Sequence, residues 1–376
     1  MKIAINTRFL LKNRLEGMGR FTYETVKRIV LAHPEHDFYF FFDRQYDEEF
    51  IFAKNVHPVV LFPPTRHVVL IYLWFEFAVY RALKNIEADV FLSTDNFLCL
   101  KTKVPTVLVT HDLAFEHFPQ YNPYIVRKYY AYFGEKFNRR ADRIVAVSEY
   151  TKKDIVNTYD IDEKKISAAC NACSESFRPL SDIEKTKVRD KFSKGKDYFF
   201  YVGAVHPRKN VPQLIKAYDN FKKKSKSDFK LLIGGRFAWQ TGAVTEAYEQ
   251  AEYQADIEFI GFVSNEDLPL LMGATYGFVY PSKFEGFGIP VLEAMHSEVP
   301  VITSNVSSLP EVAGDAALLI NPDDTDDLTL ALERFYSEEN LRENLVEKGK
   351  IQREKFTWER ASQVVWENIC SLMPRV

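Results

Sequence analysis

The sequence predicts two doubly wound α/β domains in tandem, each built on a parallel sheet. The chain has 376 residues, whereas a single domain usually stops growing at about 250–300 residues. Short β-branched or aromatic runs alternate with helical stretches, which is typical of a parallel sheet covered by helices. A polar, charged segment at 174–196 interrupts the alternation, which then restarts. We therefore expect an N-terminal domain over 1–176 and a C-terminal domain over 177–357.

The first domain alternates strands and helices in chain order. Each expected strand is a short apolar run, and each expected helix is an amphipathic stretch. Ser148 can cap the helix that follows it, because its hydroxyl can accept a backbone N–H. The expected strands are Lys2–Asn6, Phe38–Phe42, Asp89–Ser93, Thr106–Thr110, Arg143–Val147 and Lys165–Ala169, and the expected helices are Arg20–Leu31, His67–Lys84, Pro123–Arg140 and Ser148–Tyr159.

The second domain follows a segment, 174–196, that we interpret as a linker with one short helix. Ligands of doubly wound sheets bind beyond the carboxyl ends of the strands, so we expect the site in a cleft between the domains. The expected strands are Tyr198–Val202, Phe229–Ile233, Ile257–Ile260, Gly277–Tyr280, Val299–Thr303 and Ala317–Ile320, and the terminal helices are Asp324–Tyr336, Glu338–Phe356 and Trp358–Met373.

Composition excludes several classes of protein. The chain carries 49 Lys+Arg against 52 Asp+Glu, a net charge of −3, which argues against nucleic-acid binding. The apolar stretch Val68–Tyr80 is interrupted by Glu76 and is shorter than the ~20 residues of a membrane span. The N-terminus lacks the long apolar core of a signal peptide. Cys170 and Cys173 form a lone CxxC without a nearby His, which favours a structural role over zinc or redox chemistry. We expect a soluble, cytoplasmic protein.

A glycine loop between two glutamates follows the expected strand Gly277–Tyr280. Pro290 fits the first turn of a helix. The free N–H groups and the positive dipole end of such a helix attract anions. Glu285 and Glu293 bracket this point, and carboxylates accept hydrogen bonds from sugar hydroxyls. Phosphate between hydroxyl-bearing groups describes a nucleotide-sugar, and the alternative is a plain glycine turn with Glu293 as a surface residue.

A basic pair, Arg208 and Lys209, stands between the strand Tyr198–Val202 and a helix. Arginine offers a planar fork of donors and lysine a point charge, so the pair can neutralise a diphosphate. Pro207 stiffens the turn. A solvated basic turn is the alternative, but the position at the same strand–helix edge as the glutamate loop favours a phosphate site.

Gly17 and Gly19 stand before the first expected helix. They are not a dinucleotide fingerprint, because about ten residues separate them from the strand and Thr22 stands at the third glycine position. Hydride transfer with a nicotinamide is therefore disfavoured, whereas contact with a diphosphate still fits.

His111 ends the expected strand Thr106–Thr110 and precedes Asp112. Parallel sheets place functional side chains at this end, so we expect His111 to bind a sugar or stabilise charge near its anomeric centre, with a structural role as the alternative. Asp160 and Asp162 form a DxD in a charged turn, and we do not expect them to hold a cation.

These segments, in order, resemble the family 4 glycosyltransferases of the GT-B fold. E-G-F-G-I-P-V-L-E, from Glu285 to Glu293, is similar to that family's two glutamates separated by seven residues. Y-V-G-A-V-H-P-R-K-N-V is similar to its phosphate-binding segment. A-V-S-E-Y-T-K-K-D-I, T-H-D-L, G-M-G-R-F and S-S-L-P-E-V-A-G-D-A-A-L-L-I-N-P-D-D also match. The resemblance spans nearly the whole chain and implies two Rossmann-like domains facing a central cleft, with 358–376 packing back on the first.

The resemblance implies retaining transfer of a hexose from an α-linked nucleotide-sugar, without a metal or another cofactor. By position, the catalytic residues would be His111, Arg208, Lys209 and Glu285. The donor would be bound by Gly17, Gly19, Arg208, Lys209, the main chain at Phe262 and Val263, Glu285, the N–H groups of Gly286, Phe287 and Gly288, and the ribose partner Glu293. Two positions depart from the family pattern: Ala204, where some members carry a basic residue, and Ala172, where many carry glycine.

The motifs themselves do not identify the donor. The resemblance of the H-D-L and P-R-K-N segments favours GDP-mannose and leaves UDP-sugars open. The expected acceptor is a glycan or lipid-linked hydroxyl in surface polysaccharide synthesis. Alternatives are a nucleotide-sugar epimerase or phosphorylase, a non-catalytic sugar-nucleotide-binding protein, and an interaction scaffold. The aromatic helix 67–84 and the basic-aromatic segment 121–140 leave acceptor docking or peripheral membrane contact open.

Overall fold

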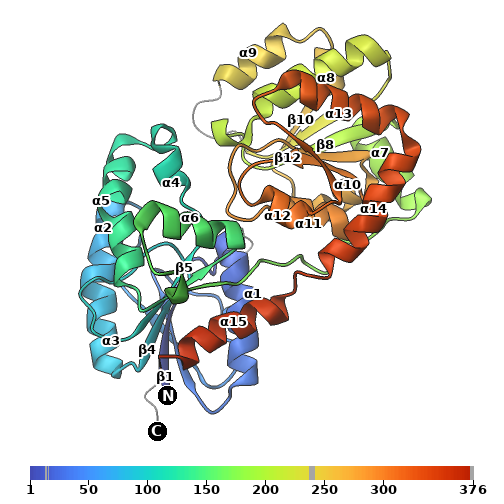
Figure 1. Cartoon of the computed structure of the whole chain (residues 1–376). Coiled ribbons are helices and arrows are strands. Elements are labelled where there is room, and N and C mark those ends of the chain that lie inside the picture. Colours follow the sequence, from blue (N-terminus) through green and yellow to red (C-terminus); the bar gives the residue numbers. More distant parts are fainter. Residues whose placement is uncertain (13–14, 16, 237–241, 373–376) are drawn as a thin grey trace. The chain divides into compact units, whose positions relative to one another are not determined.

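The computed structural model describes residues 1–12, 15, 17–236 and 242–372 (Figure 1). The chain forms two compact units. Unit 1 is Met1–Asn171 with Thr357–Val376, and unit 2 is Ala172–Phe356. Each unit is a parallel sheet with helices packed on it, which confirms the predicted fold class.

The sheet of unit 1 has seven parallel strands in the order β3-β2-β1-β4-β5-β6-β7. The strand Val56–Val60 was not predicted. It contains Pro58, which cannot donate to a strand ladder, and the edge of a sheet is where a strand tolerates proline. The strands are β1 (Lys2–Asn6), β2 (Asp37–Phe42), β3 (Val56–Val60), β4 (Val90–Ser93), β5 (Thr106–Thr110), β6 (Arg143–Ala146) and β7 (Ile166–Ala168).

The helices of unit 1 follow the predicted order, except that the short helix Ala114–His117 was not predicted. The helix expected over 67–84 contains a π-helical stretch, Trp74–Val79, that turns three consecutive residues, 74–76, into the interior. Ser148 caps its helix as predicted, with the Thr151 N–H donating to its hydroxyl at 3.0 Å. The helices are α1 (Gly17–Ala32), α2 (Val68–Leu73), α3 (Tyr80–Ile86), α4 (Ala114–His117), α5 (Tyr124–Arg140), α6 (Glu149–Tyr159) and α15 (Trp358–Cys370).

The last helix, α15, lies beside α1 in unit 1 (Figure 1). The rings of Phe21 and Trp358 meet edge to face at 6.3 Å between centroids. Arg28 Nε donates to Glu359 Oε1 at 2.8 Å, and the Trp366 ring stacks on His33, the residue after α1, at 3.7 Å between centroids. Aromatic packing and an ion pair thus hold this helix on unit 1.

The sheet of unit 2 has six parallel strands in the order β10-β9-β8-β11-β12-β13. All six were predicted, with small shifts at their ends. The strands are β8 (Tyr198–Val202), β9 (Lys230–Gly234), β10 (Ile257–Gly261), β11 (Gly277–Tyr280), β12 (Val301–Ser304) and β13 (Ala317–Ile320).

Helices cover both faces of this sheet (Figure 1). The segment expected to be a linker with one short helix holds one helix, α7, of 12 residues. Its first turn is fixed by a capping box between Ser181 and Glu184, a spacing that marks a helix start. The helices are α7 (Asp182–Ser193), α8 (Val211–Ser225), α9 (Gly242–Gln250), α10 (Asp267–Ala274), α11 (Ile289–His296), α12 (Leu309–Ala313), α13 (Thr325–Ser337) and α14 (Glu339–Arg353).

Each strand order reverses at one point, between β1 and β4 in unit 1 and between β8 and β11 in unit 2. The loops at the carboxyl ends of two such strands diverge to opposite faces, and the crevice they leave is where doubly wound sheets bind ligands. Across the described residues, no helix combines the length and hydropathy that crossing a membrane requires.

Candidate active site

The predicted basic pair lies in the turn that follows β8. Pro207–Lys209 forms a single turn of 3-10 helix, and the His206 ring accepts the Arg208 N–H at 3.2 Å. Asn210 has a left-handed backbone, with φ 62°. Its amide donates to the carbonyl of Pro322 at 2.6 Å and is buried. These bonds fix the turn, so the two cations begin from an anchored backbone.

The glutamate loop lies beyond β11, the neighbour of β8 in the sheet. The Glu285 N–H donates to Ser307 Oγ at 3.1 Å, and the Ser308 hydroxyl donates to the Glu285 carbonyl at 2.9 Å. Gly288 caps α11 with φ 109°. A side chain there would be strained, and its Cβ would lie 2.8 Å from Leu309 Cδ2. The loop is thus held from both sides at the start of α11.

The two loops join in one polar cluster around the Glu285 carboxylate. Lys209 Nζ lies 2.5 Å from Oε1 of Glu285 and 2.7 Å from the hydroxyl of Tyr280. The hydroxyls of Tyr280 and Ser282 donate to the same Oε1 at 2.9 and 2.6 Å. Arg208 Nη1 lies 3.4 Å from Oε2. The structure therefore brings together Arg208, Lys209 and Glu285 at the switch point of the sheet.

The charges in this cluster keep Glu285 ionised. Burial alone would raise the pKa of the Glu285 carboxyl, but the charges of Lys209 and Arg208 outweigh it. With hydrogen bonds from Lys209 and Ser282, they lower the pKa of Glu285 from 4.5 to about 2. Burial also raises the pKa of Tyr280 far above its ordinary value, and its contact with the Glu285 carboxylate adds to this. Tyr280 is therefore a hydrogen-bond donor at every physiological pH.

This network predicts a pH-dependent stability difference between the wild type and Glu285→Gln. Because the folded pKa of Glu285 is depressed, its stabilisation is complete above pH 4.5 and is lost as the pH falls toward about 2. The shift corresponds to on the order of 3 kcal/mol. Urea unfolding measured from neutral pH to the lowest pH at which the protein folds should show the difference shrinking. A difference that stays constant over that range contradicts an ionised, ion-paired Glu285.

The remaining donor residues predicted in unit 2 lie in the glutamate loop, on α11 and after β10. Phe287 is buried and its ring packs on Phe356 at 5.4 Å, so only its main chain can face a ligand. Gly286 and Gly288 flank it, and Glu293 is half-buried on α11. Val263 follows β10, and a Cβ added at Gly234 would lie 2.8 Å from its side chain.

His111 lies in unit 1, at the carboxyl end of β5. The ring Nε2 is 2.9 Å from the carbonyl of Thr94, and the backbone N–H of His111 donates to Asn96 Oδ1 at 2.7 Å. A carbonyl only accepts, so Nε2 carries a proton. Burial lowers the pKa of His111 below its ordinary value, although the Thr94 carbonyl and two aspartates oppose this. The neutral ring therefore has Nδ1 as an acceptor.

The two predicted glycines of unit 1 open α1. Gly17 has φ 36° and open space where a Cβ would be. Gly19 is buried, and a Cβ there would lie 2.6 Å from the carbonyl oxygen of Phe9. Close packing of α1 on the preceding loop therefore explains Gly19 by itself. Glu16, which precedes them, lies outside the described residues.

A buried ionic cluster at the β1–β4 switch point was missed by sequence reasoning. Arg8 Nε lies 2.5 Å from Asp95 Oδ2, and the Asn6 amide donates to the same oxygen at 2.9 Å. The guanidinium carbon of Arg8 lies 4.6 Å from the centre of the Phe97 ring. Asp95 adjoins Thr94, which binds His111, so the cluster fixes the loop that orients this histidine. The signal available in the sequence was that Arg8 and Asp95 each stand just after a strand.

Asp95→Asn should destabilise the protein strongly, because it leaves the Arg8 charge buried and unpaired. The side chains of this pair are 4% and 0% exposed, and breaking a buried pair costs about 3–5 kcal/mol. The control is Asp37→Asn, whose pair with His57 at 2.9 Å is roughly half exposed and should contribute less than about 1 kcal/mol. Equal losses of urea-unfolding free energy in the two variants would show that the buried Arg8–Asp95 pair stabilises the fold no more than an exposed pair does.

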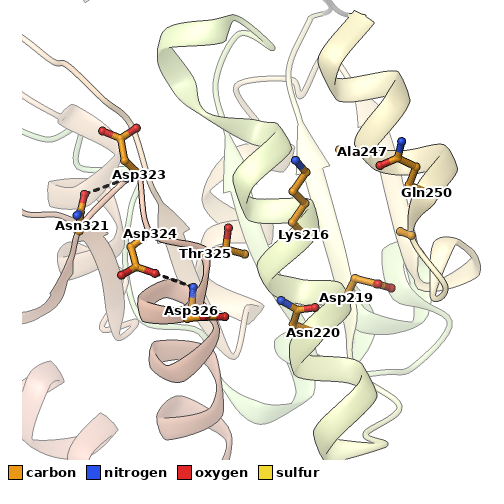
Figure 2. A pocket seen from close by; sticks show the side chains of 11 residues that line it. Lys216, Asp219, Asn220, Ala247, Gln250, Asn321, Asp323, Asp324, Thr325 and Asp326 are labelled. Carbon is orange, nitrogen blue, oxygen red and sulfur yellow. Dashed lines mark hydrogen bonds between the residues drawn. The ribbon is translucent and has the colours of Figure 1, made fainter.

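A hollow of about 710 Å³ lies elsewhere in unit 2, between α8, α9 and the start of α13 (Figure 2). No predicted site residue lines it. Its lining includes Lys216 and the four aspartates Asp219, Asp323, Asp324 and Asp326. Carboxylates in this excess repel phosphate, so the hollow does not suit a nucleotide diphosphate.

The described residues include no group of three or more His, Cys, Asp or Glu side chains placed to hold a metal ion. Asp160 ends α6 and Asp162 caps the next turn, accepting the N–H of Lys164 at 3.0 Å. The DxD therefore has a local structural role.

Comparison with known proteins decides the family. The sequence model for "Glycosyltransferase Family 4" matches residues 15–176, and that for "Glycosyl transferases group 1" matches residues 182–352. O-antigen chain mannosyltransferase B of Escherichia coli is 30% identical over 373 residues, covering 96% of this chain and 97% of that protein. The chain belongs to the family 4 glycosyltransferases.

Other relatives of this glycosyltransferase cover less of it or share only its fold. O-antigen chain mannosyltransferase RfbU of Salmonella typhimurium is 32% identical over 217 residues, 58% of this chain and 57% of that protein. The glycosyltransferase WaaG, involved in lipopolysaccharide biosynthesis, superimposes with a TM-score of 0.75 at 16% identity, over 96% of this chain and 99% of WaaG. Anabaena Alr3699/HepE in complex with UDP-glucose gives 0.77 at 16% identity, over 99% and 100% of the two chains. The predicted GT-B fold is confirmed.

Proposed function

We propose that this glycosyltransferase transfers mannose, with retention, from GDP-α-mannose to a hydroxyl of a glycan or lipid-linked acceptor in surface polysaccharide synthesis. The Arg208–Lys209–Glu285 cluster at the start of α11 supports a nucleotide-sugar donor. The mannosyltransferase relative that matches along nearly the full chain supports mannose and a polysaccharide product. GDP is the nucleotide that the P-R-K-N and H-D-L segments favour.

The observation that carries the proposal is the pairing of two half-buried cations with one buried carboxylate. The side chains of Arg208 and Lys209 are 20% and 13% exposed, so their charges act in a medium of lower dielectric than water. Before the donor binds, Glu285 pairs with both cations, offsets one of their two charges and positions them. When the donor binds, the diphosphate takes over the cations, and the Glu285 carboxylate can accept hydrogen bonds from sugar hydroxyls.

The reaction breaks the bond between the anomeric carbon and the diphosphate oxygen. Negative charge grows on the departing diphosphate, and fixed cations and the N–H groups at the start of α11 stabilise it electrostatically. The acceptor oxygen bonds to the anomeric carbon on the face that the diphosphate leaves. The acceptor proton passes to an oxygen of the leaving phosphate, so the products are an α-mannoside and GDP. The roles of His111, Gly17, Gly19, Val263 and Glu293 toward the donor stay predictions.

Product stereochemistry tests the proposal. The protein is incubated in excess EDTA with GDP-α-mannose and a panel of soluble and lipid-linked glycan acceptors, and the product anomer is assigned by NMR. We expect an α-mannoside with stoichiometric GDP. A β-mannoside would overturn retention, and turnover abolished by EDTA and restored by a divalent cation would overturn metal independence.

GDP release measured with and without an acceptor separates this function from other enzymes of the fold. A transferase releases GDP in proportion to the acceptor supplied. An epimerase converts the donor without releasing GDP, and a non-catalytic binding protein releases none under either condition. A UDP-sugar consumed in place of GDP-mannose would replace the donor assignment.

A further inference from the structure

Two neighbouring helical segments of unit 1 expose large apolar side chains among basic ones. The first is α2 with the π-helical stretch, and the second is α5. They pack together through Tyr72 and Phe133, whose ring centres are 5.7 Å apart, and they lie side by side in Figure 1. We call their exposed surface the aromatic–basic face, made by Val69, Leu73, Phe77, Tyr124, Ile125 and Tyr132 with Lys101, Arg127, Lys128 and Lys136.

The apolar side chains of this face lie open to solvent. Their exposed fractions run from 37% to 65%, although burying such groups is strongly favourable. Val69, Leu73 and Phe77 follow one another at intervals of four residues, so one side of the first segment carries a continuous apolar stripe. Contiguous exposed apolar surface marks a binding site.

Cations cover the aromatic rings of the face. Lys101 Nζ lies 4.2 Å from the centre of Phe77, and Lys136 Nζ lies 3.2 Å from the centre of Tyr132. The guanidinium of Arg127 and the ammonium of Lys128 lie 5.5 and 5.7 Å from the Tyr124 ring. An aromatic body with a long basic side chain beside it suits the boundary between hydrocarbon and lipid phosphate, where rings insert and lysines extend to the headgroups.

The charge of the face is one-sided. Residues 61–86 and 119–140 contain two acidic residues, Glu76 and Glu135. Glu76 is buried and accepts the Leu100 N–H at 2.6 Å, and Glu135 pairs with Arg139 at 2.6 Å. The whole chain has a net charge of −3, so this excess of positive charge is local. It is complementary to an anionic surface.

We propose that unit 1 binds the surface of an anionic lipid bilayer through the aromatic–basic face, without crossing it. The apolar side chains enter the interface, and the lysines and arginines contact lipid phosphates. Each basic residue near such a surface contributes about 1 kcal/mol, and the apolar side chains add hydrophobic binding. Neither contribution requires a glycan acceptor in the membrane.

Vesicle co-sedimentation tests this. The full chain is mixed with vesicles of phosphatidylcholine plus phosphatidylglycerol, or of phosphatidylcholine alone. We expect sedimentation with the anionic vesicles that weakens as salt is raised, and little with the neutral ones. Lys128→Gln/Lys136→Gln should weaken partitioning by about thirtyfold, the equivalent of two lost basic contacts. Ile125→Ser/Tyr132→Ser should weaken it at least tenfold.

Matched controls come from unit 2. Lys185→Gln/Lys187→Gln removes the same charge from α7, and Ile183→Ser/Ile351→Ser removes apolar side chains that are 71% and 72% exposed. Both controls should bind as the wild type does, and all variants should keep its thermal unfolding. No binding to anionic vesicles, equal binding to neutral vesicles, or equal losses in test and control variants would each overturn the proposal.

Discussion

Lys209→Met should lower glycosyl transfer by about a thousandfold while the protein stays folded. Lys209 supplies a fixed positive charge in a half-buried site, and removing one group that stabilises a developing anion costs about 10²–10³ in turnover. A full charge belongs at the upper end of that range. Methionine keeps most of the apolar stem, so the packing against Tyr280 is largely retained.

The loss of turnover in this variant must be distinguished from a loss of stability, because Lys209 is paired with Glu285 in the folded protein. Arg208, Tyr280 and Ser282 still contact that carboxylate in the variant, so we expect partial destabilisation and assay below the variant's own melting temperature. Lys216→Met is the matched control, since Lys216 lies on α8 and lines the hollow in Figure 2. Turnover that falls equally in both variants, or in neither, removes Lys209 from the reaction.

Glu285→Gln should reduce turnover by about 10²–10³-fold without weakening the binding of GDP. Before the donor binds, the carboxylate offsets one of the two positive charges, so its removal leaves more positive charge for a diphosphate to meet. The sugar, in contrast, loses an ionised acceptor for its hydroxyls, and hydrogen bonds to charged groups are the stronger ones. Loss of turnover with retained GDP affinity distinguishes a sugar-binding carboxylate from a purely structural one.

Calorimetric titration with GDP and steady-state rates with GDP-mannose measure the two effects. The control is Glu258→Gln. Glu258 also pairs with a buried lysine, Lys230, but Glu258 lies on the edge strand β10. We expect wild-type GDP affinity and turnover for the control. If Glu285→Gln weakens GDP binding in parallel with turnover, the carboxylate acts through the phosphate site rather than through the sugar.

Much of the fold could be predicted because its signals are local. The strands of both sheets are short apolar runs, and turn or cap residues such as Ser148 mark where helices begin. The strand Val56–Val60 was missed because it carries a proline that only its edge position permits. The helix expected in 174–196 forms as α7, but its bounds were not predicted, because Val188 is its one buried apolar residue.

The site was predictable only where one short segment carries its chemistry. Arg208, Lys209 and Glu285 stand in glycine- or proline-marked loops after strands, and the parallel pairing of β8 with β11 brings these loops together. Tyr280 and Ser282 look like ordinary strand-end residues until the carboxylate they bind is located. Arg8 and Asp95 are 87 residues apart, so their pairing depends on the β1–β4 register, which no local pattern encodes.

The most direct test of the donor site is a thermal-shift panel of GDP-mannose, UDP-glucose, ADP-glucose and dTDP-glucose on the wild type and on Lys209→Met. A ligand at a hundred times its Kd stabilises the folded state by about 2.7 kcal/mol. We expect a clear rise in Tm with GDP-mannose alone, and a much smaller rise in Lys209→Met. An equal or larger rise with another nucleotide-sugar, or a GDP-mannose shift unchanged in Lys209→Met, would contradict a GDP-mannose site built on Arg208, Lys209 and Glu285.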